Sequence, residues 1–157
     1  MPPGRLVVLC GLPGSGKTTL AREVESRLGA VRFTPDEWMT RLDVDLFDEA
    51  FRGRLEARLW ELAQDLVLGG RTVVIDFGSW ARVERDVFLR WARSSGVAVE
   101  LRVCQAPLDE LVRRVLERDE PGTVPLTEDD LRGYLANWQP PDAAERARYD
   151  PPARLPG

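Results

Sequence analysis

Eight residues near the N-terminus constrain the fold more than any other part of the chain. They follow the pattern Gly-x-x-x-x-Gly-Lys-Thr and run from Gly11 to Thr18. An apolar run comes directly before them in residues 5–10, and residues 17–28 then carry apolar side chains at helical spacing. A buried strand, a glycine loop and a helix, in that order, form the context in which this pattern binds phosphate.

The positions of this loop have distinct expected parts in holding a nucleoside triphosphate. Backbone N–H groups curl inward, and the helix N-terminus adds about half a positive charge. Lys17 is expected to span the β- and γ-phosphates, Thr18 to ligate Mg²⁺, and Thr19 to contact the α-phosphate. We predict ATP as the nucleotide, with GTP left open, and Mg²⁺ as the metal. The other predicted nucleotide-binding residues are Gly11, Pro13, Gly14, Ser15 and Gly16.

Lysine is used only once in the chain. Lysine and arginine together number 22, yet the single lysine is Lys17, inside the loop. Arginine therefore serves wherever a generic positive charge suffices. A compact ammonium acts on phosphate as a point charge and is not equivalent to a planar guanidinium. This placement supports phosphate binding.

Apolar runs alternate with helical patterns along the rest of the chain. This alternation predicts an α/β fold, a doubly wound parallel sheet of four or five strands with helices on both faces. A fifth strand is not evident. The expected strands are residues 5–10, 31–34, 72–76 and 97–104, and the expected helices are residues 17–28, 46–68, 82–94, 108–118 and one that opens at 127.

Length and composition favour one domain without a membrane segment. The chain has 157 residues, and we assign residues 1–150 to a single domain with a lid at about 107–126. We expect residues 151–157, rich in proline, to be a disordered tail. No apolar run approaches the ~18 residues of a membrane span, and the first residues lack a secretory signal. We therefore expect a cytoplasmic protein, and the oligomeric state stays open.

Composition also excludes several classes of function. The chain contains no histidine, which rules out histidine-dependent triads and histidine metal sites within it. The only cysteines, Cys10 and Cys104, each end an apolar run and are expected to be buried thiols. The net charge of −4 repels a nucleic-acid backbone. Nucleic acid is thus an unfavoured partner, and a small molecule is preferred.

Two aspartates follow predicted strands at the edge of the sheet that carries the loop. Asp76 ends the third strand, where phosphoryl-transfer proteins place a carboxylate for Mg²⁺. Its alternative role is in a turn. Asp36 follows the second strand and is placed to accept the proton of a substrate hydroxyl. Its alternative role is to start a helix, since Pro35-Asp36-Glu37 also has that pattern.

Arginines and tryptophans near these motifs supply further candidates. Arg114 and Arg118 share one helix face and could stabilise charge on the transferred phosphate, or else form a solvated basic face. On the acceptor side, a tryptophan could stack on a substrate or belong to the core. An arginine there could bind an anionic group or face solvent. The acceptor-side candidates are Trp38, Trp80, Arg82 and Arg85.

Together these segments resemble a known family. The loop Gly11–Thr18, the sequence Pro-Asp-Glu-Trp at 35–38, residues 73–78 and Arg114-x-x-x-Arg118 look like the AAA-domain-type P-loop ATP-binding proteins of bacteria. That group is related to polynucleotide kinases, zeta toxins, chloramphenicol phosphotransferase and gluconokinase-like kinases. The resemblance implies a P-loop NTPase-type three-layer fold with strand order 2-3-1-4-5.

The same resemblance implies roles for individual residues. Asp36 becomes the catalytic base, Lys17, Arg114 and Arg118 act on the phosphates, and Asp76 is an active-site carboxylate. Related polynucleotide kinases carry an arginine three residues after the base, where this chain has Met39.

Three functions are therefore considered. The leading hypothesis is an ATP- and Mg²⁺-dependent kinase that phosphorylates a hydroxyl of a small molecule such as an antibiotic, a sugar or a nucleoside. The alternatives are a 5′-hydroxyl polynucleotide kinase and a non-catalytic ATP-binding switch.

Overall fold

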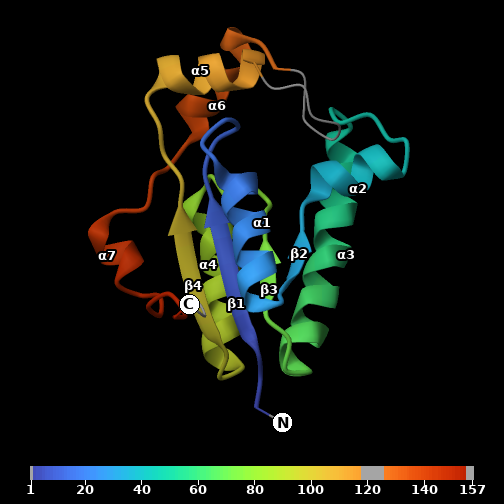
Figure 1. The fold of residues 1–157 in the computed structure, drawn as a ribbon, viewed down its shortest axis with the longest axis vertical. Helices are drawn as coiled ribbons and strands as arrows, with labels where there is room; N and C mark the ends of the chain where they lie inside the picture. The colour runs from blue at the N-terminus through green and yellow to red at the C-terminus, as the bar shows by residue number, and fades with distance from the viewer. Residues whose placement is uncertain (1, 118–125, 155–157) are drawn as a thin grey trace.

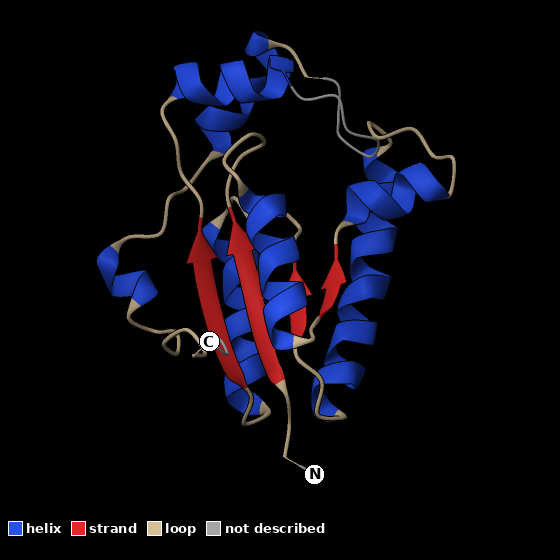
Figure 2. Ribbon diagram, viewed as in Figure 1, coloured by secondary structure: helices blue, strands red, loops and turns tan. Residues whose placement is uncertain are grey.

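A parallel sheet forms the centre of the computed structural model, which describes residues 2–117 and 126–154. Its strands lie in the order β2-β3-β1-β4 (Figures 1 and 2). This order confirms the first four positions of the predicted arrangement, and no fifth strand is present among the residues described. The strand bounds are β1 Arg5–Cys10, β2 Val31–Phe33, β3 Val73–Ile75 and β4 Ala98–Val103.

Helices cover both faces of the sheet, so the predicted three layers are present (Figure 2). Helix α1 packs on one face, and α3 and α4 pack on the other. None of the helices among the described residues combines the length and the apolar composition that a membrane span requires. The helix bounds are α1 Lys17–Leu28, α2 Pro35–Arg41, α3 Glu49–Leu68, α4 Arg82–Ser94, α5 Leu108–Glu117, α6 Glu128–Asn137 and α7 Ala143–Arg146.

The central strand β1 divides the core between the two faces. Leu6 and Val8 join the cluster under α3 and α4, whereas Val7 and Leu9 join the cluster under α1. Side chains along a strand alternate between faces, so the apolar residues 6–9 of β1 fill both clusters. Cys10, which ends this strand, is buried as a free thiol.

Helices α5 and α6 pack on each other above the carboxyl ends of the strands (Figure 1). Val115 of α5 forms a buried cluster with Leu126, which precedes α6, and Leu131, which lies within α6. The part of the predicted lid at 118–125 lies outside the described residues. In the described part of this segment, Leu111 and Val115 of α5 lie close to Gly14 of the phosphate loop.

Two details of the sequence-based prediction need correction. Helix α2 was not predicted as an element, although a helix start at Pro35 was one interpretation, and Asp36 lies in its first turn. Residues 151–154 were expected to be disordered, but the Ala153 N–H donates to Glu100 Oε1 at 2.7 Å, and Arg5 donates to the Pro151 carbonyl at 3.3 Å. Hydrogen bonding to the sheet edge therefore orders this part of the tail. Residues 155–157 lie outside the described residues.

Candidate active site

The glycine loop has a backbone that side chains other than glycine rarely adopt. Gly14 and Gly16 have φ values of 82° and 93°, in the left-handed region that favours glycine. Gly11 is tight for another reason: a Cβ there would lie 2.6 Å from the Cys104 carbonyl oxygen. The sequence places glycine where the loop must curl before α1, so backbone N–H groups can face a phosphate.

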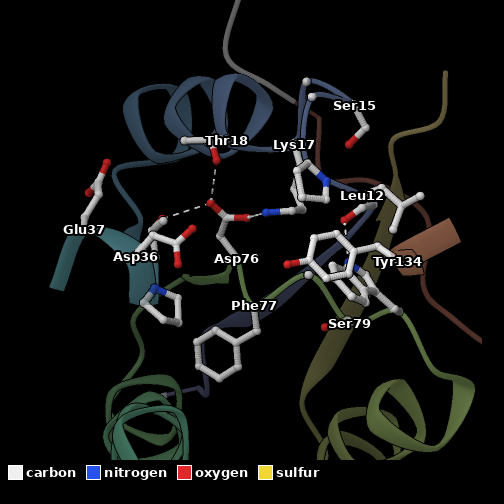
Figure 3. Close-up of a pocket in the computed structure, with 18 of the residues that line it drawn as sticks. Leu12, Ser15, Lys17, Thr18, Asp36, Glu37, Asp76, Phe77, Ser79 and Tyr134 are labelled. Carbon is white, nitrogen blue, oxygen red and sulfur yellow. Dashed lines mark hydrogen bonds and ion pairs between the residues drawn. The ribbon is translucent and has the colours of Figure 1, made fainter. Parts of the chain in front are cut away.

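Asp76 lies at the centre of a polar cluster beneath this loop (Figure 3). Its side chain is fully buried, and one carboxylate oxygen contacts the Lys17 ammonium. The other oxygen accepts hydrogen bonds from Thr18 Oγ1 at 3.2 Å and Thr34 Oγ1 at 3.0 Å. A buried carboxylate requires such partners, because an unpaired charge in the interior is costly. The cluster brings together three predicted site residues and adds Thr34.

This cluster suits Mg²⁺. The ion prefers oxygen ligands and keeps several waters, so proteins bind it through one or two side chains plus substrate phosphates. Thr18 Oγ1 and Asp76 Oδ2 are adjacent oxygens of this type beside the phosphate loop. No group of three or more cysteine, aspartate or glutamate side chains in the described ranges forms a metal site of its own. The donor set therefore fits a metal that arrives with a nucleotide.

A cavity of about 1000 Å³ opens beside the loop and extends toward α2 and α3. The whole loop lines one end, and Asp36 lines the cavity as well. Figure 3 shows the carboxylates of Asp36 and Asp76 in the same space. The cavity therefore joins the predicted phosphate site to the predicted base. Of the other predicted residues, Trp80 and Arg114 also line it.

Asp36 is held by a cation that sequence reasoning missed. Its Oδ1 lies 2.5 Å from Nη2 of Arg52 on α3. The same guanidinium nitrogen donates to the Leu46 carbonyl at 3.1 Å. Arg52 thus ties the loop before α3 to the carboxylate on α2. Arg52 lies in the first turn of α3, and its spacing in the sequence does not identify Asp36 as its partner.

Arg114 reaches the phosphate loop from α5. It donates to the Gly14 carbonyl at 3.0 Å and contacts Glu110 at 2.5 Å, one helical turn away. The side chain is about two-fifths exposed, so it is neither buried nor on a purely solvated face. Position and exposure both allow it to contact a phosphate in the loop. Arg118, its predicted companion, lies outside the described residues.

The tryptophans have different surroundings. Trp80 donates from Nε1 to the Gly11 carbonyl at 3.1 Å, and its ring lies 4.7 Å from that of Tyr134 on α6. Both rings line the cavity. Trp38 instead packs near Phe33, with ring centroids 6.2 Å apart, and does not line the cavity.

Two predicted acceptor-side arginines lie elsewhere. Arg85 is fully buried: it contacts Glu145 through two hydrogen bonds of 2.6 and 3.0 Å and also donates to the Ser79 carbonyl. Its interpretation as an acceptor contact is therefore wrong, because the guanidinium faces the interior. Arg82 is half exposed, with Asp86 at 3.9 Å, and does not line the cavity. The sequence predicted the start of this helix correctly, but it did not predict which face of the helix points toward the cavity.

Glu56 is a cavity residue that the sequence analysis did not select. It lies one turn beyond Arg52 on α3 and is half-buried. Burial raises the pKa of its carboxyl to about 7, and the nearby charges of Glu84 and Asp36 add to the rise, while Arg52 and Lys17 oppose it. The apolar spacing of α3 continues through Leu55 and Leu59 without including Glu56, so the sequence pattern did not single it out.

Comparisons with known proteins agree on the fold. A family model described as an AAA domain matches residues 6–141. The APS kinase CysC of Mycobacterium tuberculosis, solved with AMPPNP and APS, is 28% identical with a TM-score of 0.61, over 74% of this chain and 71% of that chain.

Two further solved structures show the fold alone, given their identities. A gluconokinase from Sinorhizobium meliloti 1021 is 20% identical with a TM-score of 0.61, over 92% of this chain and 79% of that chain. A sugar kinase from Janibacter sp. HTCC2649 is 24% identical with a TM-score of 0.60, over 91% and 82%. None of the curated proteins matches the chain.

Proposed function

Because this chain belongs to the AAA-domain family of P-loop proteins, we propose that it is an ATP- and Mg²⁺-dependent phosphotransferase whose acceptor is a hydroxyl of a small molecule. One observation carries the proposal: a single cavity contains both the phosphate loop and Asp36. A nucleotide-binding switch needs the loop but has no need of a carboxylate beyond it. The 28% identical APS kinase, solved with AMPPNP and APS, supports ATP as the donor.

The proposed reaction is a direct transfer. The acceptor oxygen forms a bond to the γ-phosphorus while the bond from that phosphorus to the bridging oxygen of ADP breaks. Asp36 accepts the proton that the hydroxyl loses. Lys17 leaves its contact with Asp76 for the phosphates, and its ammonium offsets the negative charge on the transferred group.

Other residues of the chain position the reactants. Arg114, already hydrogen-bonded to the loop, is proposed to exchange Glu110 for a γ-phosphate oxygen. Arg118 remains a predicted second lid arginine. Thr18 and Asp76 would hold Mg²⁺, which supplies positive charge to the phosphates when bound.

A small molecule is the acceptor that the site favours over a nucleic acid. Met39, at the position where related polynucleotide kinases carry an arginine, is fully buried in the core. Several carboxylates line the acceptor side of the cavity. A nucleic-acid backbone requires cations to neutralise its phosphates, and the net charge of −4 provides none in excess.

Transfer of labelled γ-phosphate provides the test. The protein is incubated with Mg²⁺, γ-labelled ATP and a panel of sugars, amino alcohols, nucleosides and antibiotics, with a 5′-hydroxyl oligonucleotide in parallel. We expect a labelled phosphomonoester of at least one small molecule and none of the oligonucleotide. Preferential labelling of the oligonucleotide would replace this proposal with a polynucleotide kinase. ATP binding without transfer to any compound would favour the switch.

A further inference from the structure

The acceptor side of the cavity carries carboxylates that lack cationic partners. Glu49, Glu56 and Glu84 all line the cavity, and none of them forms an ion pair with another described residue. By contrast, Asp36 is paired with Arg52, and Asp76 with Lys17. The carboxylates without an ion-pair partner therefore lie on α3 and α4, whereas Asp36 and Asp76 at the ends of the strands are paired.

Glu56 is the most informative of the three. Glu49 and Glu84 are exposed, so solvent and salt screen their charges. Glu56 is half-buried, and the charges that act on it most strongly are those of Arg52, Glu84, Asp36 and Lys17. Burial disfavours the charged form of this carboxylate, and Glu84 and Asp36 add to that cost although Arg52 and Lys17 oppose it, so a cation that binds beside Glu56 stabilises its charge.

Ser79 gives a second, independent sign of a ligand. This residue is 4% exposed and lines the cavity, yet its Oγ is buried without a hydrogen-bond partner among the described residues. Buried hydroxyls are almost always hydrogen-bonded, so a polar group is expected to arrive from the cavity. Ser79 also has a φ of 50°, and such strained backbone clusters at ligand sites.

We infer that the acceptor is a hydroxyl compound that also carries an ammonium group, and that Glu56 binds this ammonium group. This inference rests on the phosphotransferase proposed above. The hydroxyl is then directed to Asp36, and Ser79 hydrogen-bonds a further polar group of the acceptor. An anionic acceptor would meet both the triphosphate and three unpaired carboxylates. The apolar part of such an acceptor fits against the cavity-lining side chains Phe47, Phe77, Trp80 and Tyr134.

Two matched series of compounds test the charge preference. One contains phenylethanolamine, styrene glycol and mandelate, and the other contains glucosamine, glucose and gluconate. Each compound is titrated by calorimetry into protein saturated with Mg²⁺ and a non-hydrolysable ATP analogue. We expect the ammonium member to bind at least about tenfold more tightly than its neutral and carboxylate counterparts in at least one series.

A substitution then assigns the preference to Glu56. Glu56→Gln is expected to reduce the ammonium preference to about threefold or less and to leave the affinity for the ATP analogue unchanged. The matched control is Glu61→Gln on the same helix, where the glutamate is 64% exposed and paired with Arg58. It should keep the full preference.

The pH profile separates recognition from a merely structural role. Glu56 is ionised above a pKa of about 7 and neutral below it, so the preference for phenylethanolamine should fall as pH decreases from about 8 to about 6. Phenylethanolamine itself stays protonated over that range. In the Glu56→Gln protein the preference for phenylethanolamine should not change with pH. If Glu56 had only a structural role, the pH dependence of this preference would remain in the Glu56→Gln protein.

The outcomes for the two proposals are distinct. Tighter binding of the carboxylate or neutral members, or no binding of any ammonium member to nucleotide-loaded protein, overturns the ammonium inference. Transfer of phosphate to mandelate or gluconate in preference to the others also overturns it but upholds the phosphotransferase. Absence of transfer to every hydroxyl compound, measured in the same mixtures with ATP, overturns the phosphotransferase.

Discussion

Replacing Asp36 with asparagine is expected to lower the rate of phosphate transfer by roughly 10²- to 10⁴-fold, the usual contribution of a general base. Asparagine has nearly the same shape but cannot accept the hydroxyl proton. The affinity for ATP should not change, because Asp36 lies beyond the loop, on α2. The measurement compares initial rates of labelled-phosphate transfer to the best acceptor of the panel, and calorimetry gives the ATP affinity of each protein.

Asp43→Asn is the matched control for this substitution. It removes the same charge a few residues further along, outside the cavity lining, and asparagine tolerates the left-handed φ of 56° at that position. We expect transfer close to the wild-type rate. If Asp36→Asn also transfers phosphate at that rate, Asp36 is not the base.

A second large effect is expected on stability. Arg85 and Glu145 form an ion pair whose side chains are 0% and 2% exposed. Arg85→Met would leave the Glu145 carboxylate buried without its partner, and such changes lower the free energy of unfolding by about 3–5 kcal/mol. The substitution also removes donors to the carbonyls of Ser79, Trp80 and Gln139. Chemical denaturation monitored by circular dichroism measures the loss.

Controls separate burial from charge in this experiment. Arg82→Met, on the same helix but half exposed, should change the unfolding free energy by no more than about 0.5 kcal/mol. Adding Glu145→Leu to Arg85→Met should recover part of the loss, because no buried charge then remains. If Arg85→Met is as stable as Arg82→Met, the pair does not support the fold as described.

The phosphate loop and the sheet could be predicted from sequence because local rules determine them. A glycine loop between an apolar strand and a helix has few possible conformations, and β1 lies inside the sheet because residues 6–10 are all apolar. Asp76 and Asp36 were located by the rule that parallel strands end at a common edge. The same rule applied to Thr34 would have placed it in the Asp76 cluster.

The positions of several side chains could not be predicted because their partners lie far away in the sequence. Arg85 was expected near the acceptor because it follows Asp76 closely, but its partner Glu145 is 60 residues away and turns the side chain inward. Arg52 and Glu56 lie on a helix that was predicted from its apolar spacing. That spacing did not show which face of the helix lines the cavity. Periodicity reports that a face is buried, but it does not report which polar side chain faces the substrate.

Calorimetric titration with Mg²⁺ and ATP is the most direct test of the central claim, that the loop and its lysine hold a nucleoside triphosphate. The proteins are wild type, Lys17→Ala and Arg27→Ala, the last removing an exposed cation from the same helix. We predict one ATP per chain for wild type and Arg27→Ala, and an affinity roughly 10- to 100-fold weaker for Lys17→Ala. Absence of binding to the wild type, or equal affinity in all three proteins, would contradict the account.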